Sequence, residues 1–222
     1  GMAKAKVRTE DAIAFFISPH GLGHAARAAA VMEAIRVGRP GIRLELFTTA
    51  PAWFFDSSLT GTFRYHKEAC DVGLVQRNAM DEDLPETIKV LDEFLPFSEA
   101  RVKRLAAAVR RAGCRLVICD IAPLGIAVAK AAGGPSVLVE NFTWDWIYAA
   151  YPDSGGRMRR HREYLRSWFR QATYHVQTEP VSVPAPDAAL VTTPVSRAPR
   201  LSRAKIRDRL GLGAHRKVVL LT

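Results

Sequence analysis

The sequence is poor in the residues that would place it among disulfide-rich, zinc-binding or membrane-spanning proteins. It has only three cysteines in 222 residues, Cys70, Cys114 and Cys119, and they form no C-x-x-C pair. This number and spacing argue against a disulfide framework or a zinc site and favour the reducing cytoplasm. The sequence has no run of about 18 apolar residues, the length that a transmembrane helix needs. Acidic residues are outnumbered 22 to 32 by basic ones, and the net charge of +10 favours anionic partners.

Short apolar runs alternate with helical patterns along the chain. The expected strands are Ala12–Ser18, Arg43–Thr48, Phe63–Tyr65, Leu116–Asp120, Pro135–Glu140 and, more weakly, Thr173–Gln177 and Ala189–Thr192. The expected helices are His24–Val37, Pro85–Ala112 with a break near Pro96, and Leu124–Ala132. The alternation predicts an α/β fold, a Rossmann-like, doubly wound and mainly parallel sheet with helices on both faces. Ligands of such sheets bind at the carboxyl ends of the strands.

We expect three parts along the chain. Residues 1–11 are expected to be a tag remnant and a flexible N-terminus, because Gly1 precedes a methionine. Residues 12–195 form the Rossmann-like domain, in which the aperiodic stretch 70–83 is expected to be a long functional loop. Residues 196–222 are expected to be an interdomain linker with a helix at Ala204–Leu210, followed at Val218–Leu221 by the first strand of a further domain.

A glycine-rich loop joins the first strand to the first helix. Its glycines, Gly21 and Gly23, allow close backbone approach, and the helix that follows offers free N–H groups to an anion. With Ala26 they also satisfy a dinucleotide-binding fingerprint, but the second strand ends without the acid that binds the ribose. The flanking histidines, His20 and His24, are not explained by that fingerprint. The alternative is a tight turn whose histidines only cap or bridge locally.

Asp120 ends a buried strand that should lie beside the first strand of the sheet. His24 and Asp120, 96 positions apart, can therefore meet where the carboxyl ends of the two strands converge. A carboxylate beside an imidazole fixes the tautomer of the ring and makes it a better general base. The alternative role of Asp120 is to cap the helix that follows Pro123, and the sequence permits both roles.

Two further segments combine aromatic and polar residues. Asn141 and Trp144 lie in the run NFTWD after a strand, where rings and amides suit a sugar, although ordinary core aromatics are an equal alternative. The segment Arg157–Arg170 carries six arginines against Glu163, with apolar residues at helical spacing. A surface helix with its aromatic stripe turned inward is favoured over a peripheral membrane contact.

The motifs in this order resemble a known family. The P-x-x-x-G-H pattern at Pro19–His24 is similar to that of UDP-sugar-dependent glycosyltransferases with the GT-B fold. The runs H-G-x-G-H-A-x-R and N-F-x-W-D look like those of the glycosyltransferase-like N-terminal domain of L-arabinokinases. This resemblance implies a general base at His24 with Asp120 as its partner. The implied acceptor-binding residues are His20, Gly21, Gly23, Arg27, Asn141 and Trp144.

The resemblance also sets the expected function. The chain would be the acceptor-binding N-terminal domain of a glycosyltransferase that moves a sugar to a hydroxyl acceptor, either a sugar or a lipid-linked molecule. The nucleotide-sugar donor would be bound by a second Rossmann domain missing from this chain, so the fragment alone is expected to be inactive. No metal, cofactor or nucleic acid is expected. The alternatives are a non-catalytic sugar-binding or regulatory domain and a sugar-nucleotide epimerase of the same fold. A cytoplasmic location is expected, at the inner membrane face if Arg157–Arg170 contacts lipid.

Overall fold

The computed structural model of the chain describes residues 11–153 and 155–219. Seven parallel strands form one sheet in the order β3-β2-β1-β6-β7-β8-β9. These strands are β1 (Ala12–Ile17), β2 (Arg43–Thr48), β3 (Arg64–Lys67), β6 (Cys114–Asp120), β7 (Ser136–Glu140), β8 (Tyr174–Thr178) and β9 (Leu190–Thr192). The predicted Rossmann-like α/β fold with a parallel sheet is confirmed, and each strand expected within residues 12–195 is present within a few residues.

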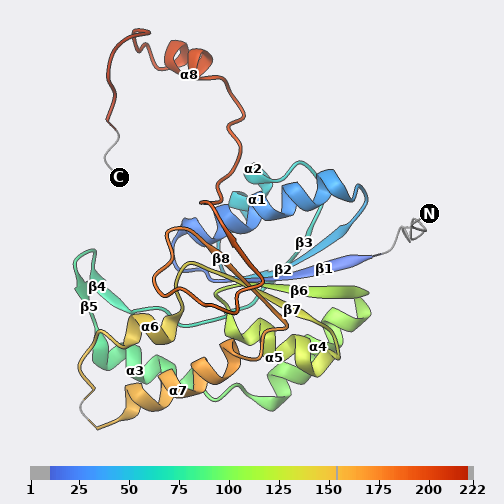
Figure 1. Cartoon of the computed structure of the whole chain (residues 1–222), viewed down its shortest axis with the longest axis vertical. Helices are drawn as coiled ribbons and strands as arrows, with labels where there is room; N and C mark the ends of the chain where they lie inside the picture. The colour runs from blue at the N-terminus through green and yellow to red at the C-terminus, as the bar shows by residue number, and fades with distance from the viewer. Residues whose placement is uncertain (1–10, 154, 220–222) are drawn as a thin grey trace.

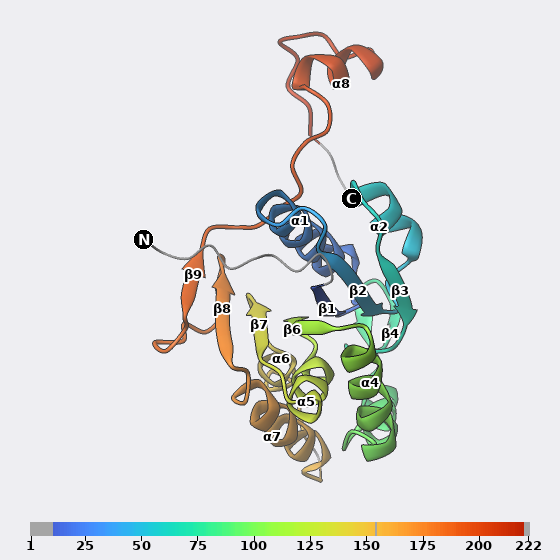
Figure 2. The same cartoon turned by 90° about the vertical axis from the view of Figure 1, so that its right-hand side faces the viewer.

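Helices cover both faces of the sheet (Figures 1 and 2). One face carries α1 (Leu22–Gly38) and α2 (Ala52–Ser58). The other carries α3 (Leu84–Phe94), α4 (Glu99–Arg111), α5 (Pro123–Ala132), α6 (Trp144–Tyr148) and α7 (Arg157–Phe169). Because successive strand residues point to opposite faces, Phe15 packs in the core under α1 and Phe16 in the core under α5. Both faces of β1 are therefore buried, as its continuous apolar run predicts.

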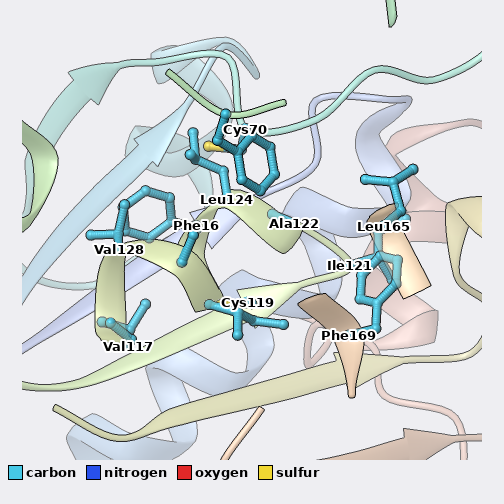
Figure 3. Close-up of a cluster of buried hydrophobic side chains, with 14 of the residues drawn as sticks. Phe16, Cys70, Val117, Cys119, Ile121, Ala122, Leu124, Val128, Leu165 and Phe169 are labelled. Carbon is cyan, nitrogen blue, oxygen red and sulfur yellow. The ribbon is translucent and has the colours of Figure 1, made fainter. Parts of the chain in front are cut away.

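Helix α5 packs closely against the sheet at Gly125. A Cβ atom at Gly125 would stand 2.6 Å from the Cys119 sulfur and 2.7 Å from Cβ of Phe16. Figure 3 shows Phe16, Cys119 and Val128 in the buried cluster between this helix and the strands. The absence of a side chain at Gly125 therefore lets α5 pack directly on β1 and β6, the two strands that carry the candidate site.

The structure corrects the expected elements in two places. The stretch 70–83 is not a pure loop, because it contains the antiparallel hairpin of β4 (Gln76–Asn78) and β5 (Asp81–Glu82). Helix α2 was not predicted. The strand expected at Val218–Leu221 lies partly outside the described residues, and Val218 and Val219 belong to no regular element.

The segment after β9 leaves the layers of the fold. Its helix, α8 (Arg203–Arg209), has no buried residue, and Figure 1 shows it standing away from the sheet. The helical expectation for this segment and the break of the long helical region at Pro96 are both confirmed. Across residues 11–153 and 155–219, no helix has the length and apolar character needed to cross a membrane.

Candidate functional site

The carboxyl ends of β1 and β6 lie side by side. In the register of this pair Ile17 is opposite Asp120, so the expected neighbour relation of the two strands is correct. The chain leaves β1 through a short loop, and Gly21, with φ of 76°, occupies the N-cap of α1 without any capping side chain. A non-glycine residue would be strained at that angle. The first turns of α1 then place His24 and Arg27 on the buried side, facing Asp120.

His24 and Asp120 are in direct contact. Nδ1 of His24 lies 2.8 Å from Oδ1 of Asp120, and the two residues are only 9% and 2% exposed. A carboxylate can only accept, so Nδ1 carries a hydrogen, and in the neutral form of the ring Nε2 has the lone pair. Asp120 does not cap the following helix, because Ala122 occupies the N-cap of α5 and no side chain caps it. The cap alternative is therefore wrong, while the catalytic role of the pair stays a prediction.

A strained residue follows Asp120. Ile121 has φ of 44° and is fully buried, although β-branched residues rarely adopt positive φ. Such backbone conformations cost about 1–3 kcal/mol and cluster at functional sites. Flanking backbone hydrogen bonds hold the turn: Ser18 N donates to Asp120 O, and Ile121 N donates to Val139 O. The strand end that presents the Asp120 carboxylate is thus fixed from both neighbouring strands.

Arg27 holds the centre of the site together. Its Nε and Nη2 donate to the two oxygens of Asp120 at 2.7 and 2.6 Å, which is a bidentate ion pair. Its Nη1 donates to Oδ1 of Asn141 at 2.8 Å and to Oγ1 of Thr178 at 3.2 Å. Arg27 therefore neutralises the buried carboxylate and joins α1 to the ends of β6, β7 and β8. Most of its N–H groups are engaged within the protein, and acceptor contact by Arg27 stays a prediction.

A pocket of about 310 Å³ opens above this network. Of the expected site residues, His20, Gly23, His24, Arg27 and Asn141 line it, whereas Gly21, Asp120 and Trp144 do not. The lining residues that the sequence analysis missed are Phe142, Thr178, Glu179, Pro194 and Val195. Phe142 follows Asn141 in the run NFTWD, but no local pattern distinguishes the other four.

Asp71 is a buried carboxyl group that the sequence analysis did not single out. It is 7% exposed, and its Oδ2 accepts from Nε1 of Trp144 at 2.8 Å. The Ser18 hydroxyl favours its ionised form, yet Oδ1 has no well-formed hydrogen bond within the described part of the chain. Burial raises the pKa of Asp71 to about 6, against the opposing effects of Ser18, Trp144 and His24. Trp144 is thus an anchor for this carboxyl behind the pocket, and its acceptor contact stays a prediction.

His20 is held between Trp144 and Gly73. The rings of His20 and Trp144 meet at 90° with centroids 4.9 Å apart. A Cβ atom at Gly73 would stand 2.2 Å from Nδ1 of His20, so only glycine leaves room for the ring. Burial, and then the nearby His24, lower the pKa of His20. A neutral imidazole is therefore expected at this wall of the pocket at neutral pH.

The basic helix α7 packs as predicted, as a surface helix with its apolar side turned inward. Its apolar residues Met158, Leu165 and Phe169 are buried. Arg157 and Arg160 pair with Asp92, and Nε of Arg166 lies 3.0 Å from Oδ2 of Asp145. Part of the positive charge is thus balanced within the protein, which argues against a membrane contact. In the described ranges no group of three or more His, Cys, Asp or Glu side chains could hold a metal ion.

No model of a known protein family matches the chain. One curated relative, the L-arabinokinase of Arabidopsis thaliana, is 29% identical over 150 residues. The match covers 66% of this chain but only 14% of the relative. The motif-based resemblance to L-arabinokinases is therefore supported by sequence comparison, over a small part of a much longer protein.

Solved glycosyltransferases share the fold. A UDP-glucose:anthocyanidin 3-O-glucosyltransferase in complex with UDP matches with a TM-score of 0.56 at 12% identity, over 88% of this chain and 55% of that one. Arabidopsis thaliana UGT89C1 complexed with quercetin gives 0.55 at 13% identity, over 90% and 54%. Medicago truncatula UGT71G1 complexed with UDP-glucose gives 0.53 at 12%, over 92% and 57%. This chain, which spans little more than half of each, therefore has the Rossmann-like fold of GT-B glycosyltransferases and resembles an L-arabinokinase in sequence.

Proposed function

We propose that this chain is the acceptor-binding domain of a glycosyltransferase with His24 as the general base. The contact between His24 and Asp120 is the observation that carries the proposal. It leaves one ring nitrogen, Nε2, without a protein partner among the described residues, and His24 lines the pocket. A hydroxyl group in the pocket can therefore give its proton to Nε2.

The chemistry follows from the tautomer of His24. As the acceptor oxygen forms its bond to the anomeric carbon, its proton moves to Nε2, and the bond from that carbon to the nucleoside diphosphate breaks. The carboxylate of Asp120 then faces an imidazolium, which it stabilises and keeps in place. General base action of this kind contributes about 10²–10⁴-fold. Arg27 orients the carboxylate of Asp120 through its bidentate contact.

We propose that a further domain binds the nucleotide-sugar donor. This chain spans 54–57% of the three solved glycosyltransferases compared above, and two of these are complexes with UDP or UDP-glucose. The isolated chain should then bind UDP weakly or not at all. Micromolar binding of UDP by the isolated chain, measured by calorimetry, would show that the donor site lies in this chain and would refute the proposal.

Substitution of the two site residues tests the base. In the full-length protein, His24→Gln and Asp120→Asn should each lower the transfer rate by about 10²–10⁴-fold. Thermal unfolding should confirm that both variants fold. His215→Gln, an exposed histidine far along the chain, is the matched control. Undiminished turnover by folded His24→Gln protein would refute the proposed base.

A second candidate function is a non-catalytic sugar-binding domain. The likeness to an L-arabinokinase favours it, because this chain matches only 14% of a protein that is named for a kinase activity and not for sugar transfer. Full-length protein that binds sugars at this pocket but transfers none would support this candidate.

We also propose a cytoplasmic location, because the three cysteines are free, as is usual in a reducing compartment.

A further inference from the structure

Arg27 determines which hydrogen-bonding groups the pocket presents. Because a guanidinium only donates, the amide oxygen of Asn141 and a lone pair of the Thr178 hydroxyl must face Arg27. The NH₂ group of Asn141 and the O–H of Thr178 can then donate, and neither has another partner among the described residues. Both residues line the pocket. The buried network thus presents two oriented donors to a ligand.

The same pocket presents two acceptors. One is Nε2 of His24, which lies opposite the ring nitrogen that binds Asp120. The other is the carboxylate of Glu179, an exposed side chain that lines the pocket and has no ion pair in residues 11–153 and 155–219. Donors and acceptors are therefore mixed around one small space.

An apolar wall completes the pocket. The half-buried ring of Phe142 meets the ring of His24 edge-on, with centroids 5.7 Å apart. Pro194 and Val195 line the pocket as well. The volume of about 310 Å³ is at the lower end of the range for ligand pockets, which suits a single ring-sized unit.

We propose that this pocket binds a neutral, polyhydroxylated acceptor, that is, a sugar unit with one hydroxyl at Nε2 of His24. Each sugar hydroxyl both donates and accepts, so neighbouring hydroxyls can satisfy Asn141, Thr178 and Glu179 together. The C–H face of the ring can lie against Phe142. The proposal rests on the proposed function only in calling the bound sugar an acceptor.

Two other ligand chemistries fit the pocket less well. A phosphate group offers mainly hydrogen-bond acceptors, and it would place negative charge beside the carboxylate of Glu179. The positive charge of Arg27 does not offset this, because it is engaged with Asp120. A flat phenol offers too few hydroxyls for both oriented donors, Asn141 and Thr178, and leaving buried polar groups unpaired is costly.

Ligand titrations of the histidine-labelled chain, followed by NMR, test the inference. The probes are a panel of methyl pentosides and hexosides covering axial and equatorial hydroxyls, inorganic phosphate, and phenol; His24→Gln assigns the His24 signal. At least one glycoside should shift that signal with millimolar affinity, and phosphate and phenol should not. A panel in which no glycoside shifts the signal, or in which phosphate or phenol alone does, would overturn the proposal.

Three near-isosteric variants make the test specific. Asn141→Asp and Thr178→Val remove the donors and should each weaken glycoside binding by about tenfold. Glu179→Gln removes the charge, so it should weaken glycoside binding several-fold and allow phosphate to bind better. Glu163→Gln, an exposed glutamate on α7, is the matched control and should change nothing. Glycoside binding that is equal in all folded variants would show that the sugar binds elsewhere.

The outcomes separate this inference from the proposed function. Glycoside binding by the chain, with no transfer activity in the full-length protein, would keep the sugar site and refute the transferase. Transfer to a phenol by the full-length protein, with no glycoside binding, would keep the transferase and refute the sugar acceptor.

Discussion

Replacing Asp71 by asparagine should stabilise the folded chain at neutral pH. The carboxyl group is 7% exposed, and burial raises its pKa from 3.8 to about 6. The folded state therefore binds this proton more tightly than the unfolded state does. The free energy that the bound proton adds to folding is complete below about pH 4 and is lost as the pH rises through about 6. A shift of about two units corresponds to about 3 kcal/mol. An amide avoids this penalty, and its oxygen can still accept from Nε1 of Trp144.

Urea unfolding of both proteins at a series of pH values measures the effect. The difference in free energy of unfolding between variant and parent should grow by about 2 kcal/mol from about pH 4.5 to about pH 7.5. Asp56→Asn, which changes an exposed carboxyl on α2, is the control and should leave the pH profile unaltered. Parallel profiles for Asp71→Asn and the parent chain would show that the folded state does not raise the pKa of Asp71, and would refute the reasoning.

Three further substitutions or assays probe the network, the core and the basic helix. Arg27→Met should destabilise the fold by about 3–5 kcal/mol in urea unfolding, because it leaves the carboxylate of Asp120 buried without its guanidinium partner; a smaller loss than 1 kcal/mol would contradict this. Gly125→Ala should lower stability by about 1–2 kcal/mol, since its Cβ would overlap Cys119 and Phe16, and unchanged thermal unfolding would argue against the close approach of α5. In co-sedimentation the chain should bind anionic and neutral vesicles equally, because arginines of α7 pair with Asp92 and Asp145; salt-sensitive binding to anionic vesicles alone would restore the membrane contact.

The sheet could be predicted because its signals are local. The run from Ala12 and the run that ends at Asp120 are continuously apolar, since both faces of a central parallel strand are buried. The doubly wound order then places these strands side by side, and from this order an approach of His24 to Asp120 could be predicted. Sequence alone thus determined the fold class, the edge of the sheet that carries the site, and one pair of side chains within it.

Only the tertiary structure decided what surrounds that pair. Arg27 lies three positions from His24, yet its partners Asn141 and Thr178 are 114 and 151 positions away. Asp71 belongs to a stretch without hydrophobic periodicity. Its buried carboxyl group accepts a hydrogen bond from Trp144, which lies 73 positions later in the chain. Hydrophobic periodicity in the sequence indicates which face of its own helix or strand a residue occupies. It does not indicate which residue of another element that residue contacts. The charge balance of the pocket and the direction of its donors therefore depend on contacts that form only when the chain has folded.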